Sequence, residues 1–226
     1  MTDAHFHEGG HVWLELRGER FRFCGIHPWN AGRADAAEAV DEIRRMVEAD
    51  PSAGVGEIGL DRLKTKSVTD SQREVFLAQL SIAADMHRPV VLHGAKCWGE
   101  VVRCVKPFAG AVPAFLFHGF SRSGGLVPDI EAVNGFVGVG TAVLNDRAVN
   151  YRELVRRLPE DRILAETDFD GGDGSREDML RAVVGKITEL SGVTEERLDG
   201  NAAAFAAHLS GTVPNDSYDR QKEKRS

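Results

Sequence analysis

Two histidines stand one residue apart near the start of the chain, His5 and His7, with Phe6 between them. In an extended strand the side chains of residues i and i+2 point to the same face, so both imidazoles can contact one metal ion. The alternative interpretation is a solvated chain end without a ligand. The pair alone is a weak signal, so the rest of the sequence must decide between the two interpretations.

Further histidines and acids follow apolar segments that are typical of buried strands. They stand at the ends of five such segments, as His27, Glu57, His93, His118 and Asp168. Side chains at the carboxyl ends of parallel barrel strands converge on one mouth, where the active sites of such barrels lie. A single histidine after a strand is more often structural, but so many polar strand ends favour a metal site.

These residue types define the chemistry that such a site could perform. Imidazole binds zinc and other transition metals, and carboxylates extend the choice to manganese and magnesium. The six candidate ligands are His5, His7, Glu57, His93, His118 and Asp168. They exceed the needs of one tetrahedral ion, so we expect one or two divalent ions (Zn, Mg or Mn). Glu57 is the natural bridge between two ions because it can lend one oxygen to each. Asp168 could bind one ion and accept a proton from an attacking water.

Short apolar segments alternate with longer amphipathic ones along the chain. Strands are predicted at residues 2–5, 11–16, 20–26, 52–58, 88–93, 113–118, 135–140 and 162–167. Helices are predicted at residues 35–49, 71–86, 97–105, 149–158, 176–190 and 201–209. Ser71 and Glu74 have the spacing of a capping box at the start of the second helix.

This alternation predicts parallel βαβ units, and eight strands favour a TIM-type α/β barrel over an open sheet. The first three segments lie too close together for a crossover connection, which needs about a dozen residues or more. Residues 11–16 and 20–26 should therefore form an antiparallel hairpin, with the barrel distorted and shortened on its N-terminal side. We expect one hydrolase domain over residues 1–211 and a disordered polar tail over residues 212–226.

Composition limits the classes of function. The 226 residues carry a net charge of −7, so a nucleic-acid partner would have to be held by a local patch or by metal ions. No apolar run is long enough to span a bilayer, and the start of the chain lacks a signal-peptide pattern. Three cysteines without disulfide or zinc-finger spacing fit a reducing cytoplasm. The sequence indicates no obligate protein partner.

Seven motifs occur in an order that identifies a family. They are D-x-H-x-H from Asp3, GIHPW from Gly25, GEIGLD from Gly56, Q-x-x-x-F-x-x-Q-L from Gln72, PVVLH from Pro89, HGFS from His118 and ETD from Glu166. Each is modest by itself, but together they resemble the TatD family of metal-dependent hydrolases over residues 3–201. The resemblance implies a distorted TIM barrel with one or two metals. It also implies phosphodiester hydrolysis, commonly by a deoxyribonuclease with exonuclease character.

The resemblance also implies roles for individual residues. By position, His5 and His7 would bind the first metal, and Glu57 would bridge the first metal and the second. Asp168 would be both a ligand of the first metal and the catalytic base. His27 matches the family position that faces the scissile phosphate.

The second metal would be bound by His93 and His118, which complete the implied ligand set. Substrate contacts are predicted at His27, Arg62, Lys96 and Ser121. Arg122 and Ser123, beside Ser121, could contact phosphate or cap a helix. Trp98 could stack on a base, although burial against the next helix is favoured. Glu166 could hydrogen-bond a ligand histidine or line the barrel.

The chain departs from the family pattern in three places. Family members have a full helix and another βα unit between H-x-H and GIHPW, whereas only a short stretch fills that gap here. After GEIGLD, Arg62, Lys64 and Lys66 could grip a phosphate or simply face solvent. Asp170 and Asp173 follow ETD and would repel a polyanion, which leaves small phosphoesters open as substrates.

We predict a metal-dependent hydrolase of phosphodiester bonds, with catalytic roles for Asp168, Glu57 and His27. Single-stranded DNA is a candidate substrate. One alternative is an amidohydrolase acting on a C–N or ester bond, because similar barrels catalyse both reactions. The absence of a lysine in the place of Glu57 argues against the type with a carbamylated lysine. Another alternative is a metal-binding barrel without turnover, although the complete ligand set argues against it.

Overall fold

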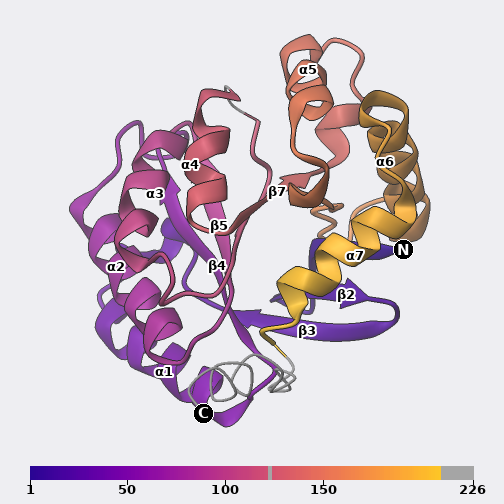
Figure 1. Ribbon diagram of the computed structural model, residues 1–226. Coiled ribbons are helices and arrows are strands. Elements are labelled where there is room, and N and C mark those ends of the chain that lie inside the picture. The colour runs from indigo at the N-terminus through magenta and orange to yellow at the C-terminus, as the bar shows by residue number, and fades with distance from the viewer. Residues whose placement is uncertain (122–123, 210–226) are drawn as a thin grey trace, which may run out of the picture.

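The computed structural model describes residues 1–121 and 124–209, whose strands form one eight-stranded sheet in chain order (Figure 1). The strands are β1 (Thr2–Glu8), β2 (His11–Leu16), β3 (Glu19–Cys24), β4 (Gly54–Asp61), β5 (Val90–Ala95), β6 (Phe115–Phe117), β7 (Gly135–Val139) and β8 (Ile163–Ala165). The predicted α/β barrel class is confirmed. The expected disordered tail at residues 212–226 lies outside the described residues.

Seven α-helices in the described ranges surround the sheet. They are α1 (Ala36–Ala49), α2 (Asp70–Asp85), α3 (Trp98–Val105), α4 (Val127–Ala132), α5 (Val149–Arg157), α6 (Arg176–Ser191) and α7 (Glu195–Ala206). Figure 1 shows α1 to α3 on one flank of the sheet and α5 to α7 on the other. None of these helices is long and apolar enough to cross a membrane.

The antiparallel strand β2 explains how β1 and β3, which lie close together in the sequence, can both end at the mouth of the barrel. β2 pairs antiparallel with both β1 and β3, while β3 to β8 pair in parallel. Two reversals cancel, so β1 runs in the same direction as β3 and its carboxyl end reaches the same mouth. The predicted antiparallel hairpin at residues 11–16 and 20–26 is confirmed.

The barrel closes where β1 meets the segment that follows β8. The Asp168 N–H donates to the His5 carbonyl oxygen over 3.0 Å, and the His7 N–H donates to the Phe169 carbonyl oxygen over 2.7 Å. The buried Asp3 carboxylate adds to this seam, because it accepts the N–H and the hydroxyl of Thr167 over 3.0 and 2.7 Å. These bonds fix the position of Asp168 relative to both histidines.

Asp3 should therefore contribute strongly to stability. The Asp3→Ala substitution leaves the buried Thr167 N–H and one bond of Arg176 unpaired, which should lower the free energy of unfolding by about 3 kcal/mol. Glu15→Ala is the matched control, because it removes the second, partly exposed carboxylate partner of Arg176 and should cost less than about 1 kcal/mol. Urea unfolding measures both. Equal losses would contradict a closing role for Asp3.

Two core layers surround the strands. One lies between the sheet and the outer helices, where alternate strand residues such as Val90, Phe115 and Phe117 are fully buried. The other fills the barrel and contains the intervening residues. α7 supplies Phe205 to this inner layer, together with side chains of β5, β6 and β8. The inner layer is apolar, so the polar residues of the strands gather above it.

The structure corrects the extent of the fourth strand. Residues 52–58 were expected, but β4 continues to Asp61, so Glu57 lies inside the strand rather than at its end. The register with β5 shifts between Val55 and Ile58. Gly59 permits this irregular pairing, because it has a φ of 150° and a Cβ there would lie 2.0 Å from the His93 carbonyl oxygen.

The predicted start of the second helix is wrong. Thr69, and not Ser71, is the N-cap residue, and its hydroxyl accepts the Gln72 N–H over 3.2 Å. Thr69 has the extended backbone that a cap requires, whereas Ser71 already lies within the helix. The last helix also begins earlier than residue 201, because Thr194 caps it at Glu195.

Candidate metal centre

The alternation of side chains along the strands places polar residues at the mouth. Val91 points into the inner apolar layer, and His93, two residues later on β5, lies above it. Leu116 on β6 and His118 after that strand repeat the arrangement. Because residues two apart share a face, β5 and β6 each contribute an apolar side chain below and direct a ligand-type side chain to the mouth.

Four ligand-type atoms lie close together between β1, β4 and the segment after β8. His5 Nε2 and His7 Nε2 are 3.2 Å apart, as expected for two residues on one strand face. Glu57 Oε2 lies 3.7 Å from each of them. Asp168 Oδ1 lies 3.5 Å from His5 Nε2 and 3.4 Å from His7 Nε2. Residues far apart in the sequence therefore converge on one small volume.

These spacings match the demands of a metal ion. Ligands at 2.0–2.2 Å around a tetrahedral zinc ion are separated from one another by about 3.4 Å. The distance between the two imidazole nitrogens, and the distances from each of them to Glu57 Oε2 and to Asp168 Oδ1, range from 3.2 to 3.7 Å. Two imidazoles and two carboxylates also form a suitable donor set, so the residues present fit a divalent cation.

The two oxygens of Glu57 face different groups of histidines. Oε2 faces His5 and His7, whereas Oε1 lies 2.7 Å from His93 Nδ1 and 3.9 Å from His27 Nε2. His27 Nε2 is in turn 3.3 Å from His93 Nδ1. Glu57, His27 and His93 thus form a second candidate ligand group. This split is the geometry that a carboxylate bridging two ions requires.

His118 lies between the two groups. Its Nε2 is 3.9 Å from Glu57 Oε1 and 3.7 Å from Asp168 Oδ2. Its ring stacks on the ring of His5, with centroids 3.8 Å apart. The structure thus brings together all six predicted ligands. It also adds His27, which the resemblance placed at the scissile phosphate, to the group around His93.

Electrostatics within the cluster favour positive charge. Burial opposes ionisation of Glu57, but the hydrogen bond with His93 and the neighbouring imidazoles hold its pKa well below the ordinary value. The pKa of Asp168 is also lowered, because bonds from His5 and His7 outweigh burial. Both acids are therefore ionised at neutral pH and lie among imidazoles, as a cation site requires.

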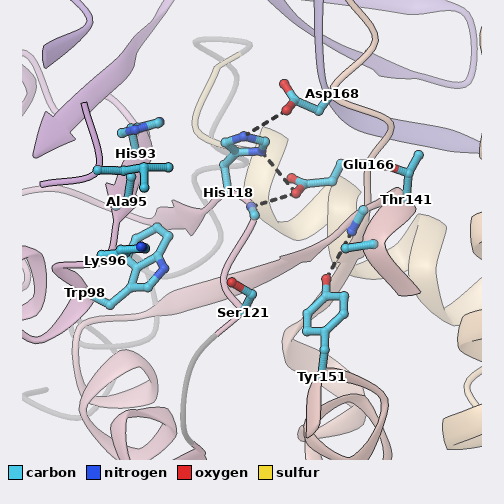
Figure 2. A pocket seen from close by; sticks show the side chains of 15 residues that line it. His93, Ala95, Lys96, Trp98, His118, Ser121, Thr141, Tyr151, Glu166 and Asp168 are labelled. Carbon is cyan, nitrogen blue, oxygen red and sulfur yellow. Dashed lines mark hydrogen bonds and ion pairs between the residues drawn. The ribbon is translucent and has the colours of Figure 1, made fainter. Parts of the chain in front are cut away.

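Glu166 holds His118 from below the mouth (Figure 2). Its fully buried carboxylate has Oε1 3.0 Å from His118 Nδ1, and the same oxygen accepts the Gly119 N–H over 2.7 Å. Burial opposes charge on His118, but Glu166 and the nearby acids raise its pKa to about 10. Gly138 makes room, since a Cβ there would lie 2.2 Å from Glu166 Oε2. The contact turns His118 Nε2 toward the cluster.

Asp61 orients His93 in the same way that Glu166 orients His118. No role for Asp61 was predicted from the sequence patterns. The buried carboxylate at the end of β4 has Oδ2 3.2 Å from His93 Nε2. The same oxygen accepts the indole N–H of Trp29 over 2.6 Å. The sequence did contain a signal for Asp61, because an acid ends the buried strand in GEIGLD. Only Glu57 of that motif was assigned a role.

Two cavities meet at the cluster. One of about 440 Å³ and another of about 620 Å³ are both lined by His93, His118 and Asp168. The first extends toward β5 and β7, past Lys96, Ser121 and Tyr151 (Figure 2). The second extends toward β1 and β3, past His27, Trp29 and Glu57. A chain-like substrate could therefore continue on both sides of the centre.

The predicted substrate contacts separate into two sets. Lys96 and Ser121 line the smaller cavity, so both can reach a ligand there. Arg62 lines neither cavity, and its guanidinium donates to the Lys96 carbonyl oxygen over 2.9 Å. The predicted burial of Trp98 is confirmed, since its side chain packs against Phe117 and Phe120. The neighbours of Ser121, residues 122 and 123, lie outside the described residues.

A barrel whose mouth carries histidine and carboxylate side chains is the architecture of metal-dependent hydrolases. The family model of TatD related DNase matches residues 5–209, so the chain belongs to this family. The resemblance inferred from the motifs is thereby confirmed.

Individual relatives agree with this assignment. The chain is 32% identical over 146 residues to the "3'-5' ssDNA/RNA exonuclease TatD" of Pectobacterium carotovorum. It is 26% identical over 185 residues to the "Uncharacterized metal-dependent hydrolase YabD" of Bacillus subtilis. The first match covers 64% of this chain and 56% of the relative, and the second covers 77% and 71%. The chain thus spans little more than half the length of the exonuclease relative.

Solved structures show the same fold. The YJJV protein of Escherichia coli K12, a TatD homolog, superposes with a TM-score of 0.70 at 23% identity, over 85% of this chain and 77% of the other. An uncharacterized amidohydrolase of Saccharomyces cerevisiae superposes with a TM-score of 0.64 at 14% identity, over 84% and 80%. These likenesses support the distorted barrel fold.

Proposed function

We propose that the chain is a metal-dependent phosphodiesterase that degrades single-stranded nucleic acid. The observation that carries the proposal is the split of Glu57 between two groups of histidines. One or two divalent ions held there would lower the pKa of a water and stabilise the negative charge of a phosphoester in the transition state. The exonuclease name of the bacterial relative supports the choice of substrate.

The residues of the chain would bind the ions, accept a proton and contact the phosphate. Glu57, His5 and His7 would hold and orient the first ion, and His27 with His93 the second. Asp168 is ionised and stands at the rim with a side chain that is 53% exposed, so it can also accept a proton from the attacking water. Lys96 and Ser121 would contact the phosphate from the smaller cavity.

Metal removal and replacement tests the proposal. The purified chain, stripped with a chelator, should not cleave labelled single-stranded DNA or RNA, and Mg²⁺, Mn²⁺ or Zn²⁺ should restore cleavage. Metal analysis of the untreated chain should show one or two bound ions. The product ladder would reveal whether cleavage begins at an end. Cleavage of amides or esters without any phosphodiester cleavage would replace this function with the amidohydrolase alternative. The cytoplasmic location expected from the sequence stays a prediction.

A further inference from the structure

Trp29 is an exposed aromatic side chain beside the candidate metal centre. Its side chain is 55% exposed, and it lines the larger cavity together with His27 and Glu57. Only four large apolar side chains are exposed across residues 1–121 and 124–209, and two of them, Trp29 and Leu63, border the two cavities of the mouth. Exposed apolar surface gathered at a cavity is typical of a binding site.

The indole is held in place although it faces solvent. Its N–H donates to the buried Asp61 carboxylate over 2.6 Å, and its ring meets His27 edge to face with centroids 4.6 Å apart. The other oxygen of Asp61 accepts the N–H groups of Leu63 and Lys64 over 2.7 and 2.9 Å. A ring fixed in advance loses little conformational entropy when a ligand binds, which favours its use as a contact surface.

The charges around Trp29 select the kind of ligand. The Lys64 ammonium lies over the ring, 4.0 Å from its centroid, and Lys96 lines the neighbouring cavity. Glu8 and Asp170 line the larger cavity and would repel an anion there. A flat ring with the Lys64 ammonium over its face fits a ligand that has a planar base joined to a phosphate, with the phosphate on the Lys64 side and away from the two acids.

We propose that Trp29 is a stacking platform for an unpaired base of the nucleic-acid substrate. The proposal deepens the proposed function and rests on it. A base that stacks on Trp29 takes the place of the Lys64 ammonium, whose flexible stem can then carry the charge to the adjoining phosphate. Asp61 is the positioning residue, because one of its oxygens contacts both the indole and His93. The platform is thereby fixed relative to the candidate metal centre.

Binding to a base-free ligand isolates this contact. Fluorescence anisotropy would compare a labelled six-thymidine phosphorothioate strand, which resists cleavage, with a strand of the same length that has abasic residues throughout. Both carry the same charge, so the ratio of their dissociation constants reports the bases alone. The wild-type chain should prefer the strand with bases by about tenfold or more. Trp29→Ala should abolish this preference, and Trp29→Phe should retain most of it.

Leu77→Ala is the matched control, since Leu77 is an exposed apolar residue of α2 that lines neither cavity. It should leave the preference unchanged. A preference that survives in Trp29→Ala, or is absent from the wild-type chain, would overturn the platform. Binding with a base preference but without cleavage of ordinary strands would support the platform and contradict the proposed nuclease function. Cleavage of ordinary strands together with an unchanged base preference in Trp29→Ala would support the proposed nuclease function and contradict the platform.

Discussion

The Glu57→Gln variant should lose both its bound metal and its phosphodiester hydrolysis. The substitution keeps the size of the side chain but removes the negative charge that five imidazoles surround. One amide oxygen cannot contact both histidine groups, so two ions bound there would lose their shared ligand, and a single ion would lose a charged ligand. Changes outside the ligand shell of a metal site already cost roughly ten- to a hundredfold, and we expect a loss in kcat/KM of more than about a thousandfold here.

Metal content and kinetics, measured on the same preparation, test this expectation. Metal analysis should find fewer ions per chain than in the wild type, and single-stranded DNA should remain uncut at any metal concentration used. Glu8→Gln is the matched control, because Glu8 lines the same cavity at its exposed rim. It should keep its metal and its activity. A Glu57→Gln chain that folds normally and cleaves at the wild-type rate would remove Glu57 from the site.

The second large effect is expected for Asp168→Asn. Asp168 is the more exposed of the two acids, and its oxygens face His5 and His7 on one side and His118 on the other. An amide can still contact an ion weakly but cannot accept a proton from water. Because general acid–base catalysis contributes about a hundred- to ten-thousandfold, kcat should fall by that factor.

The comparison of kcat with metal affinity separates the two roles of Asp168. If Asp168 accepts the proton, Asp168→Asn lowers kcat even when metal is saturating. If Asp168 is a metal ligand alone, the substitution lowers metal affinity, and excess metal restores the rate. Asp170→Asn serves as the control, since Asp170 lies two residues away and lines the same cavity. Full rescue of Asp168→Asn by excess metal would contradict a role as base.

The sequence was sufficient to predict the barrel and the convergence of the ligand residues. Histidines and acids two residues beyond apolar strand positions, such as His93 after Val91, follow directly from the alternation of a strand. The alternation of strands and helices then places these ends at one mouth. Both inferences depend on local periodicity, which a single sequence contains.

Features that depend on contacts between distant segments were not predictable in this way. The extension of β4 to Asp61 depends on how closely Gly59 approaches β5, and the irregular register is stabilised by that partner strand. Asp61 and Trp29 were overlooked because their partnership joins residues 32 positions apart. The assignment of His27 to the second ligand group likewise follows only from the position of His93 in space.

The seam between the first and the last strand affects how strongly the folded chain resists degradation. β1 and β8 are the two edges of the sheet, and the candidate centre lies across them, with His5 and His7 on one side and Asp168 on the other. An ion bound there would link β1 to the segment that follows β8. Since binding to the native state alone adds stability by mass action, metal supply would set how long the chain resists proteases.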